Sequence, residues 1–251
     1  MNHRQRWTAC QAVSRKLISK YGTEILATGV TGSVSRGADM DFSDVDFQIL
    51  VKERARVKSH RFVLKGCLFS VAARTVNDWM KEMIEPNFSL PLVVGSLKSM
   101  RIVHDPDMHF DRLRLQSESL AASCWRNAVR VGLEEMTEDL GRLRNVYAGG
   151  DWINFRRLLP LVALEATLVY SSLREQAVLS ENDLLDAKLQ GYDQKFARAL
   201  LTGFNKNSAN HKRVTTSLEW VYNVLREAAE QCRSAPVNLE SIASYVPHEE
   251  R

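Results

Sequence analysis

The apolar positions of residues 1–110 predict one amphipathic helix and several short strands. Apolar side chains first recur at helical spacing, at Trp7, Cys10, Val13, Leu17 and Ile18, and Gly22 is expected to end this helix. The segments 24–31, 45–51 and 67–73 are short and apolar or alternating, as strands are. A last strand is expected to begin at Ile102. The strongly basic segment 52–65 is interpreted as a solvated connection or a short helix.

From about residue 111 the strand-like runs stop and long helical periodicity takes over. Helices are predicted at 120–147, 152–176, 193–204 and 212–232. A shorter helix is expected before them, after Thr75, which can cap it. The pattern therefore predicts an α/β (α+β) domain with a mixed sheet at residues 1–110, followed by an all-α helical bundle domain at residues 111–251.

The composition describes an ordinary globular chain and excludes several classes of protein. The 251 residues are 45% hydrophobic, so the chain can bury a core without disulfides or a structural metal. Its 34 basic and 30 acidic side chains give a net charge of +4, which disfavours nucleic acid as the main partner. No segment has the length of a membrane span, and the four cysteines (Cys10, Cys67, Cys124 and Cys232) form no Cys-x-x-Cys. We expect a soluble, cytoplasmic protein with reduced thiols.

One group of residues combines a glycine-serine turn with two acids. Gly32 and Ser33 follow the first predicted strand, and Asp44 and Asp46 stand at the start of the next one. Residues two apart in a strand point to the same face, so both carboxylates would lie together. They repel unless a cation lies between them, and Mg²⁺ prefers such oxygen ligands together with substrate phosphates. The turn can donate hydrogen bonds to a phosphate, which Arg36 can also bind.

Each half of this pattern has a plainer interpretation, as a simple turn and as a solvated strand face. Their occurrence together favours phosphate and metal binding. The segments 32–37 (GSVSRG) and 42–47 (FSDVDF) resemble the signature of the polymerase β-like nucleotidyltransferase superfamily. The closer resemblance is to its small bacterial members, of the kanamycin, lincosamide and minimal types. The sharp motifs lie within residues 29–50.

The resemblance implies roles for individual residues. Gly32 and Ser33 would bind the phosphates of ATP or another nucleoside triphosphate. Asp44 and Asp46 would hold two Mg²⁺ ions, which bridge the triphosphate and help to activate the acceptor. Ser43 also fits the common form of the motif, which makes it a further nucleotide-binding candidate.

The family pattern also asks for a third carboxylate on a following strand, and this chain departs from it. Alignment by the strand at 67–73 places Ser70 at that position, and no Asp or Glu lies between Arg54 and Arg74. A serine is a poor metal ligand and a poor general base. Three explanations stay open: the acid comes from elsewhere, the base comes from the helical half, or catalysis has been lost and binding kept.

Glu165 bears on the second explanation. It is the only charged side chain between Arg157 and Arg174, and burial of a carboxylate there is costly unless it is paired or protonated. In the kanamycin-type relatives a glutamate of the helical domain serves as the base, which makes Glu165 the candidate by resemblance. The alternative, slightly favoured, is an ion pair with Arg156, Arg157 or an arginine of another helix.

The sequence therefore favours an enzyme, a Mg²⁺-dependent nucleotidyltransferase that passes AMP from ATP to a hydroxyl of a small molecule or protein. The alternative is a degenerate relative without the third carboxylate, which binds nucleotide or a partner protein in the manner of an antitoxin. The basic residues of 52–65 are expected to form a solvated face, or to attract a triphosphate or an acidic partner. Binding of nucleic acid through this segment is a third and weaker interpretation. The acceptor, the nucleobase and the oligomeric state, including a homodimer, stay open.

Overall fold

The computed structural model describes residues 1–179, 194–204 and 211–231. Contacts divide the chain into two compact units. The first comprises Met1–Glu85 with Leu92–Leu120, and the second comprises Pro86–Pro91 with Ala121–Arg251. The domain boundary at residue 110 stays a prediction of the sequence.

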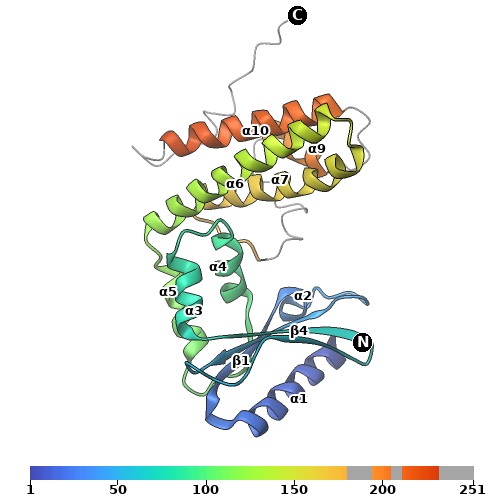
Figure 1. Ribbon diagram of the computed structural model, residues 1–251. Helices are drawn as coiled ribbons and strands as arrows, with labels where there is room; N and C mark the ends of the chain where they lie inside the picture. Colours follow the sequence, from blue (N-terminus) through green and yellow to red (C-terminus); the bar gives the residue numbers. More distant parts are fainter. Residues whose placement is uncertain (180–193, 205–210, 232–251) are drawn as a thin grey trace, which may run out of the picture. The chain divides into compact units, whose positions relative to one another are not determined.

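A five-stranded mixed sheet forms the centre of the first unit (Figure 1). Its strands follow the order β3-β4-β2-β1-β5, with β2 and β4 parallel and the other neighbours antiparallel. The predicted mixed sheet is thereby confirmed. The strands are β1 (Ile25–Thr31), β2 (Val45–Val51), β3 (His60–Leu64), β4 (Cys67–Arg74) and β5 (Arg101–His104).

Helix α1 (His3–Tyr21) covers one face of this sheet (Figure 1). Its apolar side chains, among them Cys10 and Val13, pack on Phe47 and Phe69 of the strands. Because strand residues alternate between faces, the side chains at positions 44, 46, 68 and 70 belong to the opposite face. The other helices of this part are α2 (Gly32–Arg36), α3 (Val76–Ile84), α4 (Leu90–Ser99) and α5 (His109–Glu118).

The second unit is helical. Its described helices are α6 (Ala122–Ala148), α7 (Trp152–Leu173), α9 (Gln194–Phe204) and α10 (His211–Gln231). They bury one apolar core, with Met136, Phe155, Leu200 and Leu218 among its members. The helical second half is as predicted, and positions 193 and 232, which the prediction included, lie outside the described residues, as does Cys232. Among the described residues, no helix has both the length and the apolar character to cross a membrane.

Three features of the first unit differ from the sequence interpretation. The basic segment 52–65 contains a strand, β3, which pairs with β4 at the edge of the sheet. Charged residues are common on edge strands, and here they mask the alternation of the strand. Helix α4 has no counterpart among the predicted elements. Arg6 is not among the apolar positions that predict the first helix, yet it is buried, because it has a carboxylate partner.

Candidate functional site

The glycine-serine turn lies directly between β1 and α2. Gly32 has a φ of +72°, in the region that favours glycine, and Ser33 follows it in the short helix. A Cβ atom at Gly32 would approach Oδ2 of Asp46 to less than 3.0 Å, which real Cβ atoms essentially never do. The absence of a side chain at position 32 therefore leaves room for the carboxylate of Asp46.

The two acids stand at the start of β2, where the sequence placed them. Asp44 is exposed and immediately precedes the strand, while Asp46 is half-buried within it. Val45 and Phe47 are fully buried on the α1 side, so the acidic positions face the other way. In the sheet, Asp46 pairs with Thr31 of β1. The structure thus brings Gly32, Asp44 and Asp46 together at the end of the sheet where β1 finishes and β2 begins.

Ser70 occupies the position where the family pattern asks for a third acid. On β4 it pairs with Asp46 of β2 in the parallel register. Directly paired residues of neighbouring strands point to the same face, so Ser70 lies beside Asp46. Among the described residues, no group of three or more acidic, histidine or cysteine side chains is arranged to hold a metal ion. Within that part of the chain, no carboxylate takes the place of the missing one.

The donor chemistry of the site suits a magnesium ion in part. Asp44 and Asp46 offer hard carboxylate oxygens, and the space at Gly32 keeps Oδ2 of Asp46 free of steric overlap with the turn. Mg²⁺ commonly takes one or two protein carboxylates and completes its coordination with water and substrate phosphates. Two acids are enough for that mode of binding, so the residues present fit the ion.

The remaining predicted nucleotide ligands lie close to this turn in the sequence and the fold. Arg36 ends helix α2, two residues before the loop to β2. The hydroxyl oxygen of Ser43 accepts a hydrogen bond from the backbone N–H of Met40 at 2.9 Å. Ser43 therefore also holds the shape of the loop that precedes Asp44.

A buried ion pair that the sequence analysis missed fixes the same loop. Arg6 of α1 donates to Oδ2 of Asp39 at 2.7 Å and to the carbonyl oxygen of Asp41 at 2.7 Å. His3 contacts Oδ1 of Asp39 at 2.5 Å. A loop aspartate is usually solvated, but the side chain of Asp39 is fully buried against these two partners.

The charge state of Asp39 follows from these contacts. Burial by itself raises the pKa of Asp39, but hydrogen bonds from His3 and Arg6 outweigh it and hold the pKa below its usual range. The ionised carboxylate thereby ties the loop to helix α1. The sequence offers only two signals of this pair, an arginine near the start of an amphipathic helix and an aspartate after a glycine turn. Neither signal indicates which residue the other end of the ion pair would be.

Glu165 lies in the second unit, buried between α6 and α7. Burial, and after it the neighbouring Asp139, raise the pKa of Glu165 from 4.5 to about 8. Asp139 itself is paired with Arg142 at 2.7 Å. Atom Oε2 of Glu165 has no hydrogen-bond partner among the described residues. Among the described residues, no ion pair joins Glu165 to Arg156 or Arg157, which are both exposed. Of the arginines on other helices, Arg142 of α6 lowers the pKa of Glu165 electrostatically, while its own ion pairs are with Glu138 and Asp139.

The comparisons with known proteins bear on this arrangement. No family model matches the chain. An aminoglycoside nucleotidyltransferase (4') from Staphylococcus aureus is 23% identical over 249 residues, 92% of each chain. A putative protein adenylyltransferase from Methanocaldococcus jannaschii is 28% identical over 100 residues, which is 37% of this chain and 67% of the relative.

The solved structure of a nucleotidyltransferase-like protein from Exiguobacterium sibiricum superposes with a TM-score of 0.52 at 11% identity, over 88% of this chain and 77% of that one. This chain has a nucleotidyltransferase fold. Together with the sequence relatives, it agrees with the polymerase β-like nucleotidyltransferase superfamily, as the motif resemblance implied. This fold places the glycine turn and the two acids at the same end of the neighbouring strands β1 and β2. The roles of the individual site residues stay predictions.

Proposed function

We propose that this protein transfers a nucleotidyl group, AMP from ATP, to a hydroxyl of a small molecule or a protein. The observation that carries the proposal is the approach of the Gly32 turn to the carboxylate of Asp46, beside Asp44. It brings together a glycine turn, which a phosphate can approach closely, and two acids that can ligate a metal ion. The relatives support the same kind of chemistry, since their names describe nucleotidyl and adenylyl transfer.

In the reaction, the acceptor hydroxyl oxygen forms a bond to the α-phosphorus of ATP. The bond from that phosphorus to the oxygen bridging to the β-phosphate breaks, and pyrophosphate leaves. The hydroxyl proton passes to a base. Gly32 and Ser33 position the phosphates, with Arg36 and Ser43 beside them. Asp44 and Asp46 would hold Mg²⁺, which would supply positive charge to offset that of the phosphates.

Glu165 is the candidate base. A carboxylate with a pKa of about 8 is a stronger base than an ordinary one, and its ionised form, which is the minority form at neutral pH, can accept the proton of a hydroxyl. Its place in the second unit and its burial leave this role a prediction. The acceptor classes to test first are an aminoglycoside and a protein, because one relative is an aminoglycoside nucleotidyltransferase and the other a putative protein adenylyltransferase.

A second function has its own observation. Ser70 stands opposite Asp46 in the sheet, at the position of the missing third acid. That serine is compatible with a chain that binds Mg·ATP but does not transfer AMP. Such a chain would act as a nucleotide sensor or as a protein partner of the antitoxin kind. The retained pair of repelling acids argues against a protein that binds only a partner, because such a protein has no need of a metal site.

The experiment that tests the proposal is a titration of the protein with ATP, with and without Mg²⁺, followed by pyrophosphate release with both acceptor classes. We expect ATP binding that requires Mg²⁺ and is weakened at least about tenfold in Asp44→Asn and Asp46→Asn. Asp107→Asn, a matched change at an exposed site, should bind as the wild type does. Mg²⁺-dependent binding without pyrophosphate release would favour the second function, and no binding at all would refute both.

A further inference from the structure

The row of paired residues across the sheet continues past Ser70 to an arginine. Asp46 of β2 pairs with Ser70 of β4, and Ser70 pairs with Arg61 of β3. On the other side, Asp46 pairs with Thr31 of β1. The row therefore reads threonine, aspartate, serine, arginine. Neighbouring strands lie about 4.8 Å apart, so the backbones of Asp46 and Arg61 are roughly 10 Å from each other.

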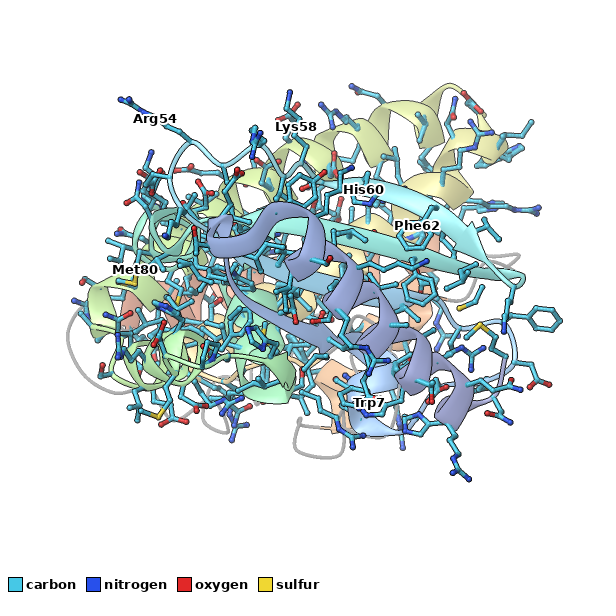
Figure 2. All side chains as sticks on the ribbon, turned by 90° about the horizontal axis from the view of Figure 1, so that it is seen from below. Trp7, Arg54, Lys58, His60, Phe62 and Met80 are labelled. Carbon is cyan, nitrogen blue, oxygen red and sulfur yellow. The ribbon has the colours of Figure 1, made fainter. Side chains whose placement is uncertain are left out.

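Arg61 belongs to the sheet face that carries Asp46. Its neighbours on the strand, His60 and Phe62, belong to the opposite face, where Phe62 stacks on the buried Phe69 with ring centroids 5.1 Å apart. Figure 2 views the sheet from the α1 side, with His60 and Phe62 labelled on the edge strand. Alternation along the strand sends the side chain of Arg61 to the other side.

The charge of Arg61 is not neutralised by the parts of the chain that the structure describes. In the same basic segment, Arg56 is bound to Glu24 by hydrogen bonds of 2.8 and 2.6 Å. Arg61 is exposed, and no ion pair or side-chain hydrogen bond joins it to a described residue. A carboxylate in place of Ser70 would lie directly beside it and would compete for the guanidinium group.

We propose that Arg61, on the edge strand β3, binds the phosphates of the nucleotide on the sheet face of Asp46, where Ser70 leaves the row without a third acid. This inference rests on the proposed function. The site then holds nucleotide phosphates from two sides, with the Gly32 turn on one side of Asp46 and Arg61 on the other.

Geometry and charge favour the outer phosphates of the triphosphate as the ligand of Arg61. Its side chain is long and starts on the fourth strand of the row, while the small Ser70 stands between the arginine and Asp46 and takes up little space there. A guanidinium group matches phosphate oxygens with paired, charge-assisted hydrogen bonds. The β- and γ-phosphates become the leaving pyrophosphate, so Arg61 stabilises the charge of the leaving group.

The test compares Arg61→Ala with Arg15→Ala, using ATP and AMP as probes in the presence of Mg²⁺. Arg15 is an exposed arginine of α1, the helix that covers the other face of the sheet, so its variant makes the same change of charge elsewhere. We expect Arg61→Ala to weaken ATP binding about 10- to 100-fold and AMP binding less than about twofold, the loss that charge-assisted hydrogen bonds to the outer phosphates would cause. Arg61→Lys should recover part of the affinity, because it keeps the charge without the paired donors.

The results distinguish the proposed function of the protein from the role assigned to Arg61. If the wild type does not bind Mg·ATP, the proposed function itself is refuted. If the wild type binds and Arg61→Ala binds ATP as Arg15→Ala does, the assignment of Arg61 is wrong while the proposed function stands. An equal loss for ATP and AMP would also overturn it, because that pattern marks a disturbed site rather than a lost contact to the outer phosphates. Unchanged thermal unfolding of both variants controls for folding.

Discussion

Replacing Glu165 with glutamine should change how the stability of the protein depends on pH. Glu165 is buried, with a relative exposure of 8%. The acids Asp139 and Glu135 of α6 raise the pKa of its carboxyl group, and Arg142 acts in the opposite sense. Glutamine has the same shape and can still donate to Asp139. The substitution therefore removes a titration while it leaves the packing between α6 and α7 in place.

The size of the effect follows from the difference in proton affinity between the folded and unfolded states. Burial, and then Asp139, raise the pKa of Glu165 from 4.5 to about 8. Between these values the folded chain holds a proton that the unfolded chain has released, so the free energy of unfolding falls as pH rises from 4.5 to 8 and levels off above 8. At about 1.4 kcal/mol per pH unit, the loss by pH 9 is on the order of 4 kcal/mol.

Urea unfolding at intervals from pH 5 to pH 9, followed by circular dichroism, measures this directly. At pH 5 the wild type and Glu165→Gln should have similar stability. At pH 9 the variant should be more stable by on the order of 4 kcal/mol. Glu230→Gln, at an exposed position of α10, should follow the wild type throughout. Parallel curves for the wild type and Glu165→Gln across the whole range would refute the reasoning.

Two further predictions concern the turn and the loop. Gly32→Ala and Gly37→Ala both place alanine at a positive φ, which costs about 1–2 kcal/mol of stability. Only at position 32 does the added Cβ also collide with Asp46. Only Gly32→Ala should therefore abolish Mg·ATP binding, measured by nucleotide titration. Arg6→Ala leaves Asp39 buried without its guanidinium partner. It should lower the free energy of unfolding, measured in urea, by about 3–5 kcal/mol. Arg4 is exposed, so Arg4→Ala should change that free energy by less than about 0.5 kcal/mol. Equal nucleotide binding by the two glycine variants, or equal stability of the two arginine variants, would contradict these expectations.

Local patterns were sufficient for most of the elements. The strand Val45–Val51 and the helix that begins after Thr75 have the predicted positions, and both capping hydrogen bonds between Thr75 and Asp78 are present. Alternation and capping are properties of neighbouring residues, so the sequence carries them in full. The edge strand β3 was missed for the same reason, because its basic residues conceal the alternation and its pairing with β4 is not local.

The site shows the same division. The sequence by itself determined that a glycine turn would follow the first strand and that Asp44 and Asp46 would begin the second. Strand periodicity alone brings these two acids to one face. Only the tertiary structure decided which residues stand beside them: Ser70 and Arg61 through strand pairing, Arg6 through burial against Asp39, and Asp139 against Glu165. Strand register and helix packing join residues that are far apart in the chain, and the free energy of such contacts depends on burial and on partners that no local pattern specifies.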